Sequence, residues 1–131
     1  MSAAARGRFP LEFLAEDRRT LERFLPGFDA QTASIPLAEM EARDSHVIEL
    51  FREAGGAGLV VPKDLKGHGA SPSAAIRVQR AVGSRSPSLA VATTMHHFST
   101  ASLIELQRAE SGFEWLLLQA IAEQGRLLAS G

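Results

Sequence analysis

The sequence predicts an all-α protein, a bundle of four or five helices joined by short loops. Apolar side chains recur at helical spacing through most of the 131 residues, and proline or glycine follows each such segment. Residues 88–104 hold no Asp, Glu, Lys or Arg, which is typical of a helix buried among other helices. A chain of this length holds one domain core.

The first half of the chain predicts two helical regions. Residues 1–10 are expected to be disordered, and residues 11–25 carry apolar positions at helical spacing until Pro26-Gly27 ends the helix. Residues 28–35 are interpreted as a connector. The second region covers residues 36–54. Within it, Asp44-Ser45 would cap the helix again halfway, and the two glycines that follow residue 54 would end it.

The middle of the chain predicts a loop followed by two helices. A short apolar piece at 58–62 and a glycine-containing loop at 63–70 come first. Ser71-Pro72 then supplies an N-cap and a first-turn proline for a helix that residues 83–87 interrupt. The central helix follows at 88–106, and the small and apolar side chains of its uncharged part, residues 88–104, predict burial on every side.

The last part of the chain predicts one more helix. Ser111-Gly-Phe-Glu114 fits a capping box before a helix at 113–123, which Gly125 ends. Residues 127–130 allow at most a stub of strand. Because the chain finishes on this apolar run, we expect it to be the first part of something longer.

Composition excludes several functional classes. Fourteen Lys and Arg against fifteen Asp and Glu give a net charge of −1, which argues against nucleic acid or an anionic membrane as a partner. The absence of cysteine excludes disulfides, thiolate nucleophiles, zinc–thiolate sites and iron–sulfur clusters. No segment has the length of a signal peptide core or a membrane span, so a cytoplasmic protein is expected.

The pair His96-His97 on the central helix admits two interpretations. Neighbouring helical residues point about 100° apart, so the two rings do not readily share an ion, and no metal site is expected. Each ring is either a buried histidine bonded to a neighbour or part of a pocket wall, and burial would lower its pKa in both cases. The small side chains of Ala92 and Ser99 leave room beside His96, which we expect to meet a ligand before His97 does.

Other motifs have simpler interpretations. Gly67-His-Gly69 begins like a dinucleotide-binding fingerprint, but Pro72 stands where the third glycine belongs, so a turn between helices is favoured. The chain contains neither a Walker loop nor a Gly-x-Ser-x-Gly elbow, so hydrolase chemistry is not expected. Charged side chains on two helices are interpreted as solvated faces rather than an anion site: Glu12, Glu16, Asp17 and Glu22 on one, Arg77, Arg80 and Arg85 on the other.

Four segments then share their order and spacing with one family. They are Ile48-Glu-Leu-Phe-Arg-Glu-Ala-Gly-Gly-Ala-Gly-Leu-Val-Val-Pro62 with the glycine loop after it, Arg80-Ala-Val-Gly-Ser-Arg-Ser-Pro-Ser-Leu-Ala90, Glu114-Trp-Leu-Leu-Leu118 and Gly125-Arg-Leu-Leu-Ala129. Together they resemble the N-terminal helical domain of the acyl-CoA dehydrogenase family. Two positions depart from the family pattern, because Lys66 replaces the first glycine of the loop and Ser86 replaces an acidic residue.

The resemblance implies a flavoenzyme with a helical N-terminal domain, a β middle domain and a C-terminal four-helix bundle. Residues 11–126 would form the helical domain, and residues 127–131 would begin the β domain. FAD and the catalytic base would lie mainly outside this segment, so no catalytic, FAD-binding or metal-binding residue is assigned within it. The central helix would supply one wall of the substrate pocket through Thr93, Thr94, Met95, His96, His97 and Thr100.

Three functions remain open on this evidence. The first is α,β-desaturation of an acyl-CoA or other acyl thioester in fatty acid metabolism, with an electron-transfer flavoprotein as acceptor. The second is a flavin-dependent monooxygenase or N-hydroxylase of the same fold, supplied by a flavin reductase. For both, a homo-oligomer, in particular a homotetramer, is expected. The third is a self-standing helical interaction module without a cofactor.

Overall fold

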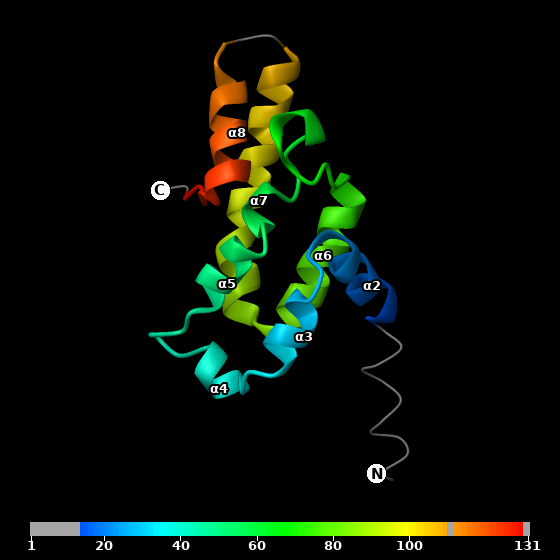
Figure 1. Cartoon of the computed structure of the whole chain (residues 1–131), viewed down its shortest axis with the longest axis vertical. Helices are drawn as coiled ribbons and strands as arrows, with labels where there is room; N and C mark the ends of the chain where they lie inside the picture. The colour runs from blue at the N-terminus through cyan, green and yellow to red at the C-terminus, as the bar shows by residue number, and fades with distance from the viewer. Residues whose placement is uncertain (1–13, 110–111, 130–131) are drawn as a thin grey trace.

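The computed structural model describes residues 14–109 and 112–129, and within them all regular structure is helical, which confirms the predicted all-α class (Figure 1). The prediction of disorder for residues 1–10 lies outside the described residues. The helices in chain order are α2 (Ala15–Phe24), α3 (Phe28–Ala33), α4 (Leu37–Met40), α5 (Val47–Glu53), the 3₁₀ turns η1 (Gly56–Gly58) and η2 (Lys63–Leu65), α6 (Pro72–Arg85), α7 (Pro87–Arg108) and α8 (Glu114–Gln124).

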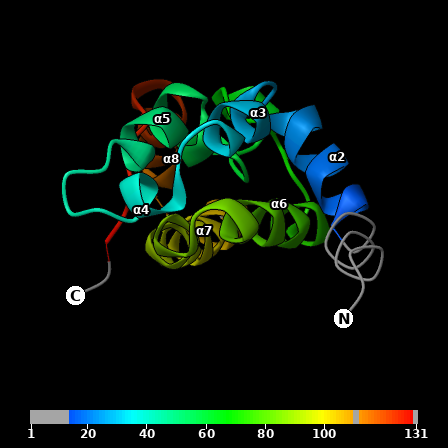
Figure 2. The same cartoon turned by 90° about the horizontal axis from the view of Figure 1, so that it is seen from below.

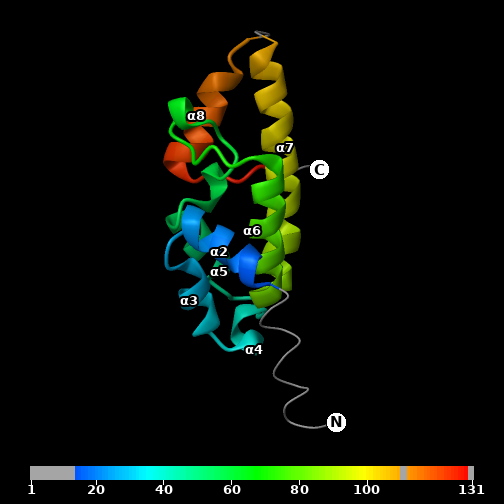
Figure 3. The ribbon, with the colours of Figure 1, turned by 90° about the vertical axis from the view of Figure 1, so that its right-hand side faces the viewer.

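The helices form two layers. Helices α6 and α7 make up one layer, and α2, α3, α5 and α8 lie over it in the other, as the views from below and from the side show (Figures 2 and 3). The main core lies between the layers. In a smaller cluster, Leu118 and Ile121 of α8 pack with Ala57 and Val61. The fully buried side chains of the main core include Leu21, Leu25, Phe28, Phe51, Leu59, Val78, Val82 and Leu89.

Two predictions in the first half of the chain need correction. Residues 28–35 are not a simple connector, because Phe28 starts a short helix, α3, and its ring packs edge-on against Phe51 at 5.9 Å. The predicted helix at 36–54 is divided into α4 and α5. The predicted cap at Asp44-Ser45 is displaced by one residue: the N-cap of α5 is His46, which has no side-chain cap, although the Ser45 hydroxyl accepts a hydrogen bond from the Val47 N–H at 3.3 Å.

The predicted starts of α6 and α7 are supported by side-chain caps. Ser71 Oγ accepts from Ala74 N–H at 3.2 Å, as the sequence predicts. Ser86 Oγ accepts from Leu89 N–H at 3.2 Å and donates to the carboxylate of Glu41 at 2.7 Å. Glu41 also accepts from Ser88, and these hydrogen bonds, first from Ser88 and then from Ser86, lower the pKa of the Glu41 carboxyl. A carboxylate from α4's end thus stands at the N-terminus of α7, where the helix dipole favours negative charge.

The loop after η1 is closed by its own backbone. Gly67 N–H donates to Pro62 O at 3.1 Å, and Gly69 N–H donates to Val61 O at 2.8 Å. A Cβ added to Gly67 would lie 2.1 Å from the Val61 carbonyl oxygen, so only glycine fits there. The interpretation of Gly67-His-Gly69 as a turn is therefore confirmed. His68 adds to the closure with a hydrogen bond from Nε2 to the Gly55 carbonyl at 3.1 Å.

The charged faces of α2 and α6 form ion pairs with each other, and most of their side chains stay exposed, as predicted; Glu12 lies outside the described residues. Asp17 is buried, although its position on α2 was expected to be exposed. The ion pairs hold α6 against α2 and α3 and leave its arginines no role as an anion site. They join Arg77 to Glu16, Arg80 to Asp17 at 3.6 Å and Arg85 to Asp29 at 2.9 Å.

The end of the described chain differs from the prediction in two details. Helix α8 begins at Glu114 with Phe113 at its N-cap and no side-chain cap, while Ser111 of the predicted capping box lies outside the described residues. Gly125 ends the helix with φ of 62°, as predicted. Residues 127–129 form no strand. None of the helices described is long and apolar enough to cross a membrane.

Candidate functional site

Helix α7 is buried on one side and open on the other. Thr93, His96 and Thr100 are fully buried. The opposite side exposes Val91 (75%), Phe98 (67%) and Met95 (46%) at helical spacing. The prediction that α7 is covered on every side is therefore wrong for the part of the chain that the structure describes. Its uncharged part, residues 88–104, therefore contributes to two different surfaces, one buried and one exposed.

The two buried threonines of the predicted wall are bonded within α7. Thr93 Oγ1 donates to the Leu89 carbonyl at 2.9 Å, and Thr100 Oγ1 donates to the His96 carbonyl at 2.7 Å. Both hydroxyls therefore satisfy themselves on the preceding turn of the helix. Neither is exposed to a ligand.

His96 is a bonded core residue. Its Nδ1 accepts a hydrogen bond from the Leu128 N–H at 2.9 Å, so its Nε2 carries the proton and donates to the Ala57 carbonyl at 2.7 Å. Burial lowers the pKa of the His96 ring, and the hydrogen bond to Ala57 opposes that shift. The ring thus ties α7 to η1 and to the segment after α8.

His97 has the opposite character. Its side chain is only 7% exposed, and neither ring nitrogen has a hydrogen-bond partner in the described part of the chain. The ring packs edge-on against Phe51 at 6.0 Å and lies 5.3 Å from the His96 ring. Burial, and secondarily the charge of His96, lower the pKa of His97 to about 4, so the ring is neutral at neutral pH. His96, which we expected to meet a ligand first, is thus the ring whose nitrogens are both bonded, and His97 is the ring whose nitrogens have no partner among the described residues.

His97 lies at a shallow hollow between α6 and α7. The Gln79 amide group braces this hollow: its nitrogen donates to Ala90 O at 3.1 Å and to Thr94 Oγ1 at 3.0 Å. Its oxygen lies 3.2 Å from Thr93 Oγ1, whose single proton is shared with the nearer Leu89 carbonyl. Gln79 has therefore used its hydrogen bonds on the protein itself. The hollow has a volume of about 370 Å³ and is lined by Ala75, Ile76, Gln79, Arg80, Ala90, Thr94 and His97.

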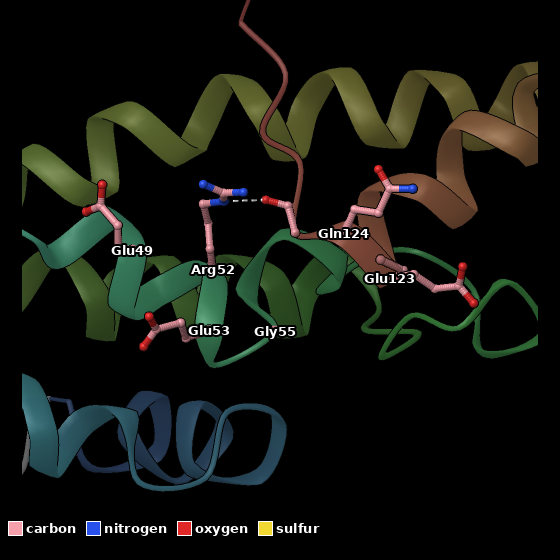
Figure 4. Close-up of a pocket in the computed structure, with 8 residues that line it drawn as sticks. Glu49, Arg52, Glu53, Gly55, Glu123 and Gln124 are labelled. Carbon is pink, nitrogen blue, oxygen red and sulfur yellow. Dashed lines mark hydrogen bonds between the residues drawn. The ribbon is translucent and has the colours of Figure 1, made fainter.

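A second hollow of about 460 Å³ lies between α5 and the end of α8 (Figure 4). Arg52 crosses it and donates from Nε to the Gly125 carbonyl at 2.6 Å, which caps the end of α8. The carboxylates of Glu49, Glu53 and Glu123 point in different directions around it. Within residues 14–109 and 112–129, no three His, Asp or Glu side chains gather as metal ligands. Arg52 therefore has a structural role, because it holds the end of α8 against α5.

The structure does not bring the six predicted wall residues onto one surface. Four of them, Thr93, His96, His97 and Thr100, belong to the buried side of α7. Thr94 lies at the rim of the hollow and Met95 on the open side. Sequence reasoning missed the brace at Gln79 and the exposed apolar pair Val91 and Phe98; the i, i+4, i+7 spacing of Val91, Met95 and Phe98 was the signal for the latter.

The chain is similar to an enzyme. It is 46% identical over 117 residues to isobutylamine N-hydroxylase of Streptomyces viridifaciens, a match that covers 87% of this chain and 31% of the relative. The chain thus spans about a third of the length of that relative. No family profile matches the chain, and no solved structure matches it. This similarity favours the N-hydroxylase alternative over the acyl-CoA dehydrogenase reaction.

Proposed function

We propose that this chain forms the substrate-wall part of a flavin-dependent N-hydroxylase that acts on a small aliphatic amine. The observation that carries the proposal is the 46% identity with isobutylamine N-hydroxylase over 87% of the chain. The sequence resemblance to the acyl-CoA dehydrogenase family supports a flavin, because that fold also serves N-hydroxylases. Under this proposal a flavin reductase, rather than an electron-transfer flavoprotein, is the partner, and the enzyme assembles as a homo-oligomer.

The open side of α7 is the part of the chain suited to the alkyl group of such an amine. Val91, Met95 and Phe98 present an apolar strip about 10 Å long. An alkyl group that leaves water against such a strip gains about 0.8 kcal/mol for each buried methylene. Of the six predicted wall residues, Met95 keeps its role in this proposal, while Thr94 and His97 line the hollow between α6 and α7. Thr93, His96 and Thr100 lie on the buried side of α7 and hold the helix in place without meeting the substrate.

The glycine loop of residues 63–70 does not fit as a holder of the flavin phosphates. The glycine loop is filled by its own backbone, since a Cβ at Gly67 would already meet Val61, and this leaves no cradle for a phosphate. The proposal therefore places FAD against other parts of the protein. When bound, the flavin would supply oxygen activation. This chain's contribution is to bind the alkyl group and exclude water from it.

The test is an assay of the protein that carries this chain, supplied with FAD, a flavin reductase, NADH and isobutylamine. Mass spectrometry should detect the hydroxylamine, one oxygen heavier than the amine. Phe98→Ala should raise KM about tenfold, or ~1.4 kcal/mol. The control Leu37→Ala removes a similarly exposed side chain from α4 and should leave KM unchanged. Unmodified amine together with oxidation of an acyl-CoA substrate would overturn the proposal in favour of a dehydrogenase.

A further inference from the structure

His97 is a buried polar ring at an apolar hollow, and the described chain gives neither of its nitrogens a partner. Buried polar side chains in folded proteins are nearly always hydrogen-bonded, so an exception calls for an explanation. The neighbouring ring of His96 shows the ordinary arrangement, with both nitrogens bonded. Within one turn of α7, both nitrogens of His96 are bonded and neither nitrogen of His97 has a partner in the described chain, so the His97 ring can still form hydrogen bonds with a ligand.

The same contrast makes His97 free to respond to a ligand. A turn of the His96 ring would break two hydrogen bonds, whereas a turn of the His97 ring about its Cβ–Cγ bond breaks none. Because His97 lines the hollow, we infer that such a turn lets a ring nitrogen reach a ligand there. A neutral imidazole then offers one donor and one acceptor.

The lining of the hollow defines the kind of molecule that fits. Ala75, Ile76 and Ala90 give apolar walls, while Gln79 and Thr94 are bonded to each other. A volume of about 370 Å³ lies at the lower end of the range for small-molecule sites. A ligand that matches these features has a short aliphatic body and a single polar group to share with His97.

The charges around the hollow exclude ionic ligands. No carboxylate lines it, so an ammonium ion would lose its hydration without gaining a counter-charge. Its cation, Arg80 on α6, is engaged by Asp17 at 3.6 Å. The other groups that face the His97 ring are His96 on α7 and Phe51 on α5. The ligand that suits this surface is uncharged.

We propose that the hollow between α6 and α7 is a binding site for a short aliphatic molecule with one uncharged hydroxyl group, which hydrogen-bonds to His97. The proposal goes beyond the function proposed above, because this site lies roughly opposite Met95 on α7. It stands or falls without the hydroxylation assay, since its test measures binding to the chain itself.

The test is a titration of the 131-residue chain, labelled with ¹⁵N at its histidine rings, with isobutanol as the uncharged probe. The His97 nitrogen resonances should shift and saturate, while those of His68, bonded to Gly55, should stay constant. Acetate and tetramethylammonium should leave both unchanged. Ile76→Ala removes an apolar wall and should weaken isobutanol binding about fivefold. Its control, Val91→Ala on the open side, should leave the affinity as it is.

The hydrogen bond is tested separately by His97→Leu, followed through the backbone amide resonances of residues that line the hollow. This variant keeps the walls and removes the polar group, so isobutanol should bind about fivefold more weakly. If His97→Leu fails to fold, Ile76→Ala still decides the question, because Ile76 is exposed and outside the core. Shifts that grow linearly without saturation, or equal affinities of Ile76→Ala and Val91→Ala, would overturn the proposal.

Discussion

Acidification should destabilise this protein through His97. Burial lowers the folded-state pKa of His97 from its ordinary 6.5 to about 4, so below the ordinary value the unfolded chain binds a proton that the folded chain refuses. The contribution of the neutral ring to the free energy of unfolding is fully present at pH values above its ordinary pKa. It is lost as pH falls and reaches its full loss of about 3 kcal/mol near the folded pKa. Between about pH 7 and about pH 5 the loss is about 2 kcal/mol.

The assay is urea unfolding followed by far-ultraviolet circular dichroism at a series of pH values. In His97→Leu the titrating group is gone, so the fall in unfolding free energy between the two pH values should shrink by about 2 kcal/mol. The remainder includes His96, whose pKa is also lowered by burial. His46→Leu, which removes an exposed histidine at the start of α5, is measured in parallel as the control for loss of a histidine. Parallel profiles for the parent and His97→Leu would refute the claim that His97 is buried in its neutral form.

Three further predictions rest on separate contacts. His96→Ala should cost about 3 kcal/mol in a thermal or urea melt, because the Ala57 carbonyl and the Leu128 N–H lose their shared partner, while the rate per folded molecule stays unchanged. Gly67→Ala should destabilise by about 3 kcal/mol, since its Cβ would meet the Val61 carbonyl at 2.1 Å; an unchanged melting temperature would contradict the closed loop. The purified chain should bind no FAD, which its absorbance spectrum after desalting would check. It should also self-associate through the exposed apolar side of α7, which analytical ultracentrifugation would detect.

Local signals in the sequence were enough to predict the ends of several helices. Ser71-Pro72 begins α6, and the left-handed glycines at 55 and 125 follow α5 and α8. In each case the signal and the structure lie within a few residues, because a cap bonds to the adjacent turn and a positive φ is a property of the residue itself. These predictions did not depend on the rest of the fold.

The features that sequence reasoning missed depend on partners far away in the chain. Glu41 bonds to Ser86 across 45 positions, and His96 bonds to Ala57 across 39. Nothing in the local pattern around Glu41 shows that it will stand at the N-terminus of α7. Likewise, the residues after Phe28 have no regular apolar period that would predict a helix. The short helix is stabilised instead by burial of the Phe28 ring in the core beside Phe51.

The mistaken prediction for α7 has a physical lesson for locating the site. A helix with a long uncharged stretch can be buried on both sides, or it can pack polar residues inward and leave large apolar residues open. Apart from the buried Leu89, residues 88–100 of α7 do the latter. The side chains of Thr93, His96 and Thr100 each donate a hydrogen bond to a backbone carbonyl, so they can be buried without leaving a polar group unpaired. The large side chains of Met95 and Phe98 stay outside, although burying them would have gained more free energy. That inversion is expected where an apolar surface serves a ligand or another part of the protein, so the open side of α7 is where the function of this chain should be sought first.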